Sequence, residues 1–382
     1  MPATIPIPSE LILPTLIDLV QIPSVNPGLS AGLGEAEAAV YCAACLREAG
    51  LDVEVQEVAP GRTNILGILR GTGGGPSLML LGHLDTEAAG EMAQPFQVRQ
   101  EDGRLHGRGA ADMKAGLATM LWAGMIFAET GLRLKGDLIV ACTADQKVGG
   151  LGTRALLATH RPSAAVLCEC TALGVGWCHP GFSWVELETR RSRGSNPIVQ
   201  ASRIVAGLDA YDRELAGRPR PEMLPPPSVR PITMQAGGEW SGHPRACRMR
   251  VERRFLPGES ESELDREIAR LMQALASGDP TFRARLLPPP AAVRPAFHHP
   301  PGSAFSQALE DAVVRATGEP ARRAGLAVWT DAALLTGAGI PTLVFGPEGL
   351  AADDDEWVSE ASLGLTAEVL VELAIGWCGL AD

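Results

Sequence analysis

Two short motifs in the first half of the chain contain side chains that could bind a metal ion. His83 and Asp85 are two residues apart at the end of the strand-like run 77–81, so both point to the same side. The imidazole can bind a metal while the aspartate holds its orientation, but a histidine fixed by a structural hydrogen bond gives the same pattern. Asp112 lies in the glycine-rich segment 107–116, which opens a predicted helix, where an aspartate is also an ordinary helix cap.

A third segment, 145–150, places an amide beside an ammonium after the apolar run Leu138–Cys142. The side chain of Gln146 has no titratable proton acceptor, so it cannot serve as a general base. Lys147, in a crowded site, could act as an acid, a base or an amine nucleophile. These two residues decide which chemistry the neighbouring metal motifs could support.

Composition narrows the range of partners. The chain has 382 residues, 46% of them hydrophobic, and a formal net charge of −12, so it can bury substantial cores and favours two domains. An acidic chain is not expected to bind nucleic acid or an anionic membrane, and no apolar run approaches membrane-spanning length. The first residues lack the basic start of a signal peptide, so we expect a cytoplasmic protein with mostly reduced cysteines.

The elements that must position these side chains follow two patterns. Apolar strands alternate with helices at both ends of the chain, which predicts an α/β layer with a largely parallel sheet. Between them, alternating strands at 183–189 and 246–255 and helices at 198–216 and 260–277 predict a small α+β domain. A proline-rich connector is expected at 218–231. We therefore predict a first domain of residues 1–181 and 293–382, with a second domain, 182–292, inserted into it.

Order and spacing together are more specific than any single motif. The segments LVQIPSVNPG, GHLDT, DGRLHGRGAADMKAG, TADQKVGGLGT, RRFLPGE, WTDAALLTGAGIPTLVFGP and DEWV extend over nearly the whole chain. In this order they resemble the dinuclear-zinc exopeptidase and deacylase family that includes acetylornithine deacetylase, succinyl-diaminopimelate desuccinylase, aminoacylase and carboxypeptidase G. The resemblance implies a zinc-peptidase-like three-layer α/β/α domain with an inserted ferredoxin-like lid, through which subunits form a homodimer.

The resemblance also implies two metal sites, of which this chain retains one. His83, Asp112 and Glu169 match the ligands of the first site, with Asp85 supporting the histidine. The second site shares Asp112, but its other two ligand positions are Lys147 and Ala352. We therefore expect at most one Zn²⁺, at His83, Asp112 and Glu169, and no second metal.

Other residues that the resemblance assigns to the reaction are also replaced. Gln146 stands at the position of the general base, and Arg193 stands at that of the lid histidine that stabilises the oxyanion in the neighbouring subunit. Arg193 could bind a carboxylate or an oxyanion, although a solvated charge on a basic run with Arg190 and Arg191 fits equally well.

The expected substrate-binding residues come from three further motifs. Ser241 replaces an asparagine of a lid turn, and the bulky Trp329 replaces a small residue before Thr330. Arg254 matches a lid arginine near the substrate carboxylate, but a strand-surface salt bridge with Glu252 is an alternative.

Lys147 has two physical interpretations. An ammonium at the second metal's position would repel a neighbouring dication and could replace it as a built-in cation, while Asp112 and Glu169 attract it. Alternatively, the site is metal-free and Lys147 pairs with one of these carboxylates, because buried charges must be compensated.

We therefore expect an enzyme that has lost two-zinc amide hydrolysis and acts on an amino-acid or acyl-amino-acid derivative by condensation, cyclisation, elimination or transfer. The alternatives are a catalytically silent relative that binds a ligand or partner, and a one-metal amidohydrolase. The expected partners are a small amino-acid-like molecule and a second copy of the chain.

Overall fold

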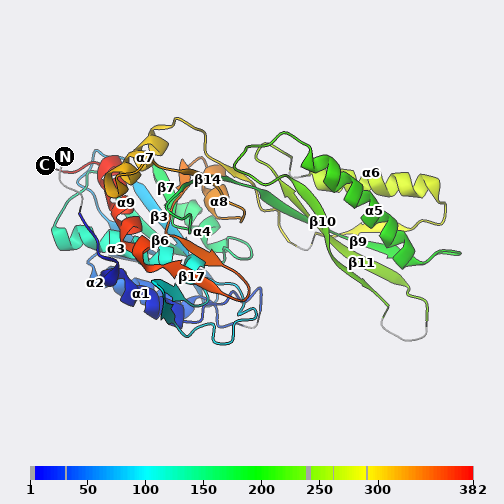
Figure 1. Cartoon of the computed structure of the whole chain (residues 1–382), viewed down its shortest axis with the longest axis horizontal. Coiled ribbons are helices and arrows are strands. Elements are labelled where there is room, and N and C mark those ends of the chain that lie inside the picture. Colours follow the sequence, from blue (N-terminus) through cyan, green and yellow to red (C-terminus); the bar gives the residue numbers. More distant parts are fainter. Residues whose placement is uncertain (1–4, 31, 238–241, 261, 290, 382) are drawn as a thin grey trace. The chain divides into compact units, whose positions relative to one another are not determined.

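The computed structural model describes residues 5–30, 32–237, 242–260, 262–289 and 291–381 (Figure 1). The chain divides into two compact units. The first contains residues up to 177, residues 299–324 and residues from 330 onward, and the second contains residues 178–298 and 325–329. The boundaries expected from the sequence were 181/182 and 292/293, and the short return of 325–329 to the second unit was not expected.

The first unit is built on a mixed sheet with the order β1-β2-β6-β3-β7-β15-β8. Its central strands β6, β3, β7 and β15 are parallel, whereas β1, β2 and β8 pair antiparallel. The strands are β1 (Asp52–Ala59), β2 (Arg62–Leu69), β3 (Leu78–His83), β6 (Leu138–Thr143), β7 (Ala164–Leu167), β15 (Thr342–Val344) and β8 (Val175–His179). Every residue of β3 and β6 is buried, as expected for central parallel strands covered on both faces.

Two groups of helices pack on this sheet. One group, α1, α2, α3, α7 and α9, is centred on α3 and α9, which contact β3; the other, α4 and α8, contacts the strands β1, β2, β7 and β15. The helices are α1 (Ser9–Gln21), α2 (Ala36–Glu48), α3 (Ala115–Thr130), α4 (Leu151–Thr159), α7 (Ala304–Thr317), α8 (Ala332–Gly337) and α9 (Glu360–Cys378). The predicted α/β class is confirmed.

Although no apolar run of membrane-spanning length was expected, helix α9 is long and apolar enough to cross a membrane, by length and composition only. Within the first unit, however, 67% of the apolar stretch of this helix is buried, and the helix packs against α1, α3 and α7. Its apolar length therefore serves the core of this unit.

A small antiparallel sheet, β16-β17-β5-β4, was not predicted from the sequence. It joins segments far apart in the chain: β4 (Arg99–Glu101), β5 (Arg104–His106), β16 (Gly349–Ala351) and β17 (Glu356–Ser359). Its strands have three or four residues, too few for an alternation pattern to be recognised.

The second unit has the element order β9-α5-β10-β11-α6-β12 and the sheet order β10-β11-β9-β12. Its elements are β9 (Gly181–Arg190), α5 (Pro197–Ala216), β10 (Ser228–Ala236), β11 (Ala246–Phe255), α6 (Glu263–Gly278) and β12 (Ala284–Leu287). This is the predicted ferredoxin-like arrangement. Two short strands, β13 (Phe297–His298) and β14 (Arg323–Gly325), pair with β8.

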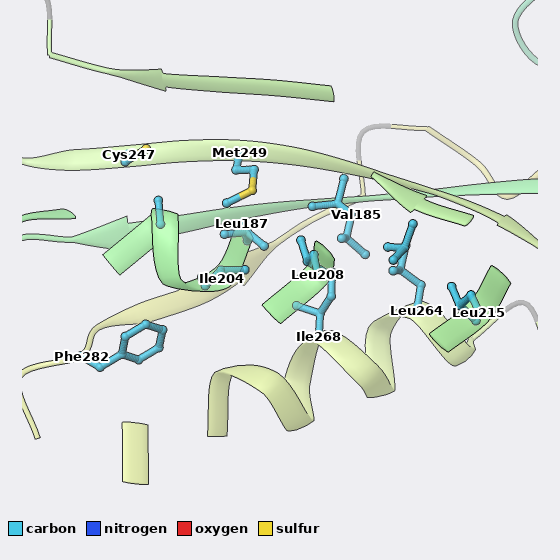
Figure 2. Close-up of a cluster of buried hydrophobic side chains, with 13 residues drawn as sticks. Val185, Leu187, Ile204, Leu208, Leu215, Cys247, Met249, Leu264, Ile268 and Phe282 are labelled. Atoms are coloured by element: carbon cyan, nitrogen blue, oxygen red, sulfur yellow. The ribbon is translucent and has the colours of Figure 1, made fainter. Parts of the chain in front are cut away.

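The core of the second unit lies between its sheet and its two helices (Figure 2). Leu187 and Met249 from the strands face Ile204 and Leu208 of α5 and Ile268 of α6. The predicted connector 218–231 is wrong at its end, because residues 228–231 belong to β10. Pro231 fits there because β10 is an edge strand, where a missing backbone N–H breaks no ladder.

Candidate active site

The candidate site lies in the first unit, where parallel strands end at the same edge of the sheet. His83 is the last residue of β3, Gln146 and Lys147 follow β6, and Glu169 follows β7. Because the carboxyl ends of parallel strands meet at one edge, residues far apart in sequence converge there. Asp112 reaches the same place from the irregular helical turn Ala110–Lys114 that precedes α3.

His83, Asp112 and Glu169 form a compact group of possible metal ligands. The Nε2 atom of His83 lies 3.0 Å from Asp112 Oδ1 and 3.2 Å from Glu169 Oε1. Zinc bonds of about 2.0–2.2 Å in a tetrahedral site separate neighbouring ligand atoms by about 3.3 Å, so these spacings fit one zinc ion. It is the single such group of histidine, cysteine and carboxylate side chains in the described part of the chain.

The ring of His83 is oriented for this role. Its Nδ1 atom lies 2.7 Å from the backbone oxygen of Asp85, to which it donates, so Nε2 faces the two carboxylates. Burial lowers the pKa of His83, but hydrogen bonds to Asp112, Asp85 and Glu169 outweigh it and raise this pKa well above its usual value. Metal binding would therefore release a proton from His83.

The carboxylate of Asp85 has a second task beside the expected support of His83. It lies 3.4 Å from Nδ1 of His83 and accepts the backbone N–H groups of Gln146, at 3.1 Å, and Lys147, at 2.9 Å. Asn26 also donates to it, at 2.7 Å. Asp85 thus supports His83 through its main-chain oxygen and its carboxylate, and the same carboxylate fixes the 146–147 backbone.

Lys147 forms an ion pair with Oδ2 of Asp112, the oxygen that does not face His83. Its ammonium also lies 3.9 Å from Glu87 Oε1. Burial lowers the pKa of Lys147, but the charges of Asp112, Glu169 and Glu87 outweigh this effect and raise it. A fixed positive charge therefore occupies one side of Asp112 and leaves Oδ1 available on the other.

Gln146 is held by hydrogen bonds at both ends of its amide. Its Nε2 donates to Glu169 Oε1 at 2.7 Å, and its Oε1 accepts from the backbone N–H of Asp331 at 3.0 Å. The residue is buried, with 2% of its surface exposed, so the amide is a positioning group in this arrangement. No proton acceptor stands at the position that the resemblance assigns to the general base.

The turn after β6 is anchored by a buried charge network that sequence reasoning missed. Asp145 adopts a left-handed backbone with φ of 76° and accepts the N–H groups of Gly149 and Leu151. Its other oxygen accepts from Arg62 at 2.8 Å, and Arg62 also pairs with the buried Glu35. Apart from the aspartate's place beside Gln146, no sequence pattern indicates this network.

Glu356 holds the turn that carries Asp112. Its carboxylate accepts the backbone N–H groups of Gly109, Ala111 and Asp112, each at 2.9 Å, and pairs with Arg108 at 2.9 Å. The glutamate is 1% exposed. The DEWV motif marked its position, but its function as an anchor could not be read from the sequence.

The two changed second-site positions, Lys147 and Ala352, offer no ligand side chain in the described structure. Ala352 contributes only backbone groups, its N–H to Asp355 and its oxygen to Arg108. His299, which follows His298 in the sequence, lies with its Nε2 atom 2.6 Å from the hydroxyl of Ser303.

The remaining predicted residues belong to both units, and one of them cannot be placed. Thr330 is buried in the first unit beside Asp331. Arg254 pairs with Glu252 at 2.9 Å, which is the alternative considered from the sequence, and also lies over the ring of Phe182. Trp329 donates to the backbone oxygen of Pro295. Arg193 lies in an exposed loop of the second unit, and Ser241 lies outside the described residues.

Fold and site together define a metallopeptidase-type chain. Residues 79–375 match the model of peptidase family M20/M25/M40, and the chain belongs to this family. It is 27% identical to an N-formyl-4-amino-5-aminomethyl-2-methylpyrimidine deformylase of Halalkalibacterium halodurans, covering 97% of this chain and 95% of the relative. It is 28% identical to an acetylornithine deacetylase of Myxococcus xanthus, covering 89% and 91%.

Solved structures agree with this assignment of the fold. The aminopeptidase PepT of Bacillus cereus superposes with a TM-score of 0.77 at 18% identity, covering 97% of this chain and 99% of that one. The YXEP protein of Bacillus subtilis, described as a dinuclear metal-binding peptidase, gives 0.73 at 18% identity, covering 96% and 97%. The family is metal-dependent, and its members here are described as hydrolases.

Proposed function

We propose that this protein binds one zinc ion at His83, Asp112 and Glu169, and that it processes an amino-acid or acyl-amino-acid derivative without two-metal hydrolysis. The ion pair between Lys147 and Oδ2 of Asp112 carries this proposal. It puts an ammonium on the side of Asp112 that a second metal would use, while the first ligand set stays together.

The ligand atoms can accept a single metal without rearrangement. Oδ1 of Asp112 is not the oxygen that binds Lys147, and the Glu169 oxygen that accepts from Gln146 has further lone pairs. When bound, zinc supplies a Lewis acid that polarises a carbonyl or carboxylate oxygen.

The chain's own residues would then determine the course of the reaction. Lys147 offers a fixed positive charge and a hydrogen-bond donor beside the substrate oxygen, since its ion pair with Asp112 favours the charged form over an amine nucleophile. Gln146 cannot accept the proton of a water molecule. The site therefore retains the means to bind and polarise an acyl group but lacks the usual means to deliver hydroxide, which favours condensation, cyclisation, elimination or transfer.

The test combines metal content with turnover. We expect the purified protein to bind one zinc per chain, to lose it in His83→Ala, and to hydrolyse N-formyl, N-acetyl and N-succinyl amino acids no faster than metal-free protein. A triple variant, Gln146→Glu with Lys147→Glu and Ala352→His, should bind two metals and gain hydrolysis. Rapid hydrolysis by the natural protein that disappears in His83→Ala would contradict the proposal.

A one-metal amidohydrolase is the second candidate. It is favoured by the complete ligand group and by the deformylase and deacetylase among the relatives. The same assay separates the two, because this candidate requires zinc-dependent release of formate or acetate. Zinc binding with no conversion of any acyl-amino acid, alone or with a second amine, would indicate a silent binding protein.

A further inference from the structure

The second unit has a basic hollow at the start of helix α5. Its volume is about 820 Å³, and its lining comes from the loop 191–197 and from residues 243–245. Three arginines, Arg191, Arg193 and Arg245, contribute to this lining together with His243. The hollow lies entirely within the second unit.

The two segments that carry these arginines are tied together. The backbone N–H of Arg191 donates to the oxygen of Arg245 at 2.9 Å, as an extension of the pairing between β9 and β11. The loop is closed by Ser192 and Ser195, whose hydroxyls lie 2.8 Å apart. The backbone segments that carry the three arginines are therefore held together, and the three side chains are exposed at the hollow.

The arginines that line this hollow differ in their described ion pairs from other arginines of the same unit. Glu188 pairs with Arg190, Arg248 and Arg285, and Arg218 lies among Glu259, Glu263 and Glu267. By contrast, none of the described lining residues of the hollow is acidic, and its three arginines form no ion pair with a described carboxylate.

The three arginines of the basic run 190–193 do not share one environment. Arg190 turns to Glu188, whereas Arg191 and Arg193 line the hollow. In a chain with a net charge of −12, three arginines without a described carboxylate partner give this hollow a local positive potential that attracts anions.

The N-terminus of α5 adds to the attraction for anions. This helix has 20 residues, begins with Pro197, and is capped by Asn196, which accepts from the N–H of Ile198. The positive end of its dipole lies at the residues that line the hollow.

We propose that this hollow, the arginine pocket, binds a doubly charged oxyanion group such as a phosphate. Guanidinium groups donate in pairs to phosphate and carboxylate oxygens, and three of them match the three free oxygens of a phosphate monoester better than the two of a single carboxylate. The pocket would thus recognise a phosphorylated ligand. The proposal does not depend on the metal site or on the reaction proposed above.

Binding of inorganic phosphate to the full, metal-free chain tests the proposal. Calorimetry at constant ionic strength should show phosphate and sulfate binding at least tenfold tighter than acetate. Metal-free protein and the His83→Ala variant should behave alike, which excludes phosphate held at the metal ligands. The triple variant Arg191→Gln, Arg193→Gln, Arg245→Gln should weaken phosphate binding at least tenfold, whereas Arg220→Gln, an exposed arginine outside the pocket, should not change it.

Chemical protection gives an answer that does not depend on folded variants. Phenylglyoxal modification, mapped by mass spectrometry, should slow at Arg191, Arg193 and Arg245 when phosphate is added, and should be unaffected at Arg220. Equal affinity for acetate and phosphate would show that the pocket does not prefer a doubly charged group over a carboxylate, and would overturn the proposal. Absence of protection, or a triple variant that binds phosphate as the natural chain does, would also overturn it.

Discussion

The two oxygens of Asp112 face different positive groups. Oδ1 lies 3.0 Å from the imidazole of His83, and Oδ2 pairs with the ammonium of Lys147. Burial raises the pKa of Asp112, but the positive charge of Lys147, together with His83, outweighs it and lowers this pKa. Because a dication at the ligand group would lie near the ammonium, Lys147 should weaken metal binding while it holds Asp112 in place.

Replacing Lys147 by methionine should therefore strengthen zinc binding, by about tenfold or more, because a loss of roughly 1.4 kcal/mol of repulsion corresponds to that factor. Competition with a chromophoric chelator measures the affinity directly. Lys135→Met removes an exposed lysine and serves as the matched control. Weaker binding in Lys147→Met would mean that the lysine is needed to position Asp112 more than it repels the metal.

Asp331 should make the stability of the metal-free protein depend on pH. Burial raises the pKa of this carboxyl from 3.8 to about 7, and the nearby Asp85 and Glu169 add to the effect, against hydrogen bonding by Thr153 and the charge of His83. Between about pH 4 and about pH 7, the carboxyl of Asp331 is protonated in the native state and ionised in the unfolded state. The free energy of unfolding therefore falls as the pH rises through this range.

Asp331→Asn removes this dependence. Its free energy of unfolding should match that of the natural chain near pH 4 and exceed it by up to about 4 kcal/mol at pH 8, since each pKa unit is worth about 1.4 kcal/mol. Urea unfolding of the chelated protein at both pH values measures the difference. The exposed Asp209→Asn should leave the pH profile unchanged, and equal profiles for all three chains would contradict the burial argument.

The metal-ligand group could be predicted from sequence because each residue sits in a motif with its own spacing. His83, Asp112 and Glu169 were expected together, and the pairing of Lys147 with a carboxylate was one of two interpretations considered. The bonds of Gln146 could not be predicted, because they join it to Glu169 and to the backbone of Asp331, 185 positions away. A side chain's hydrogen-bond partners across a fold leave no periodic signal in the sequence.

At the level of elements, Glu356 on β17 fixes the turn before α3. One carboxylate satisfies three backbone N–H groups of this turn and the guanidinium of Arg108, which is 4% exposed. The turn has no capping side chain of its own, so the carboxylate of Glu356 accepts the N–H groups that a cap would otherwise satisfy. The position of Asp112 thus depends on a strand more than 240 residues further along the chain.

Glu356→Gln should destabilise the protein by about 3–5 kcal/mol, because it leaves the buried Arg108 without a counter-charge and turns an amide N–H₂ toward backbone donors. Zinc affinity should fall as well, since Asp112 loses its anchor. Thermal unfolding and chelator competition measure the two effects, with the exposed Glu319→Gln as control. Unchanged zinc affinity in a folded Glu356→Gln would show that the turn holds Asp112 without the glutamate.

Elements with a long, regular pattern were predicted well, and those defined by pairing were not. The helix predicted at 198–216 is found as α5, Pro197–Ala216, and the helix predicted at 260–277 is found as α6, Glu263–Gly278. By contrast, the pairing of β5 with β17 and the extension of β10 through Pro231 depend on partners remote in sequence. Strand pairing is decided by tertiary contacts, which a local pattern does not contain.

For the whole molecule, the sheet edges indicate where a second copy could bind. The sheet of the second unit has two edge strands, β10 and β12, and on β10 the side chains of Ile232 and Met234 are 46% and 50% exposed. The pairing of β10 with β11 is irregular between Pro231 and Thr233. An outer strand with unpaired backbone groups and exposed apolar side chains is a template for pairing with another chain. We propose that the protein forms a homodimer through this edge.

The proposed dimer should have twice the chain mass of 40.2 kDa in sedimentation velocity, and the double variant Ile232→Lys, Met234→Lys should sediment as a monomer. Lysines on an edge strand disfavour pairing through repulsion and desolvation, and exposed positions tolerate them in the monomer. Val55→Lys, at a 58% exposed position on β1, tests the outer edge of the other sheet. A monomeric natural chain would refute the dimer, and dissociation by Val55→Lys alone would move the interface to the first unit.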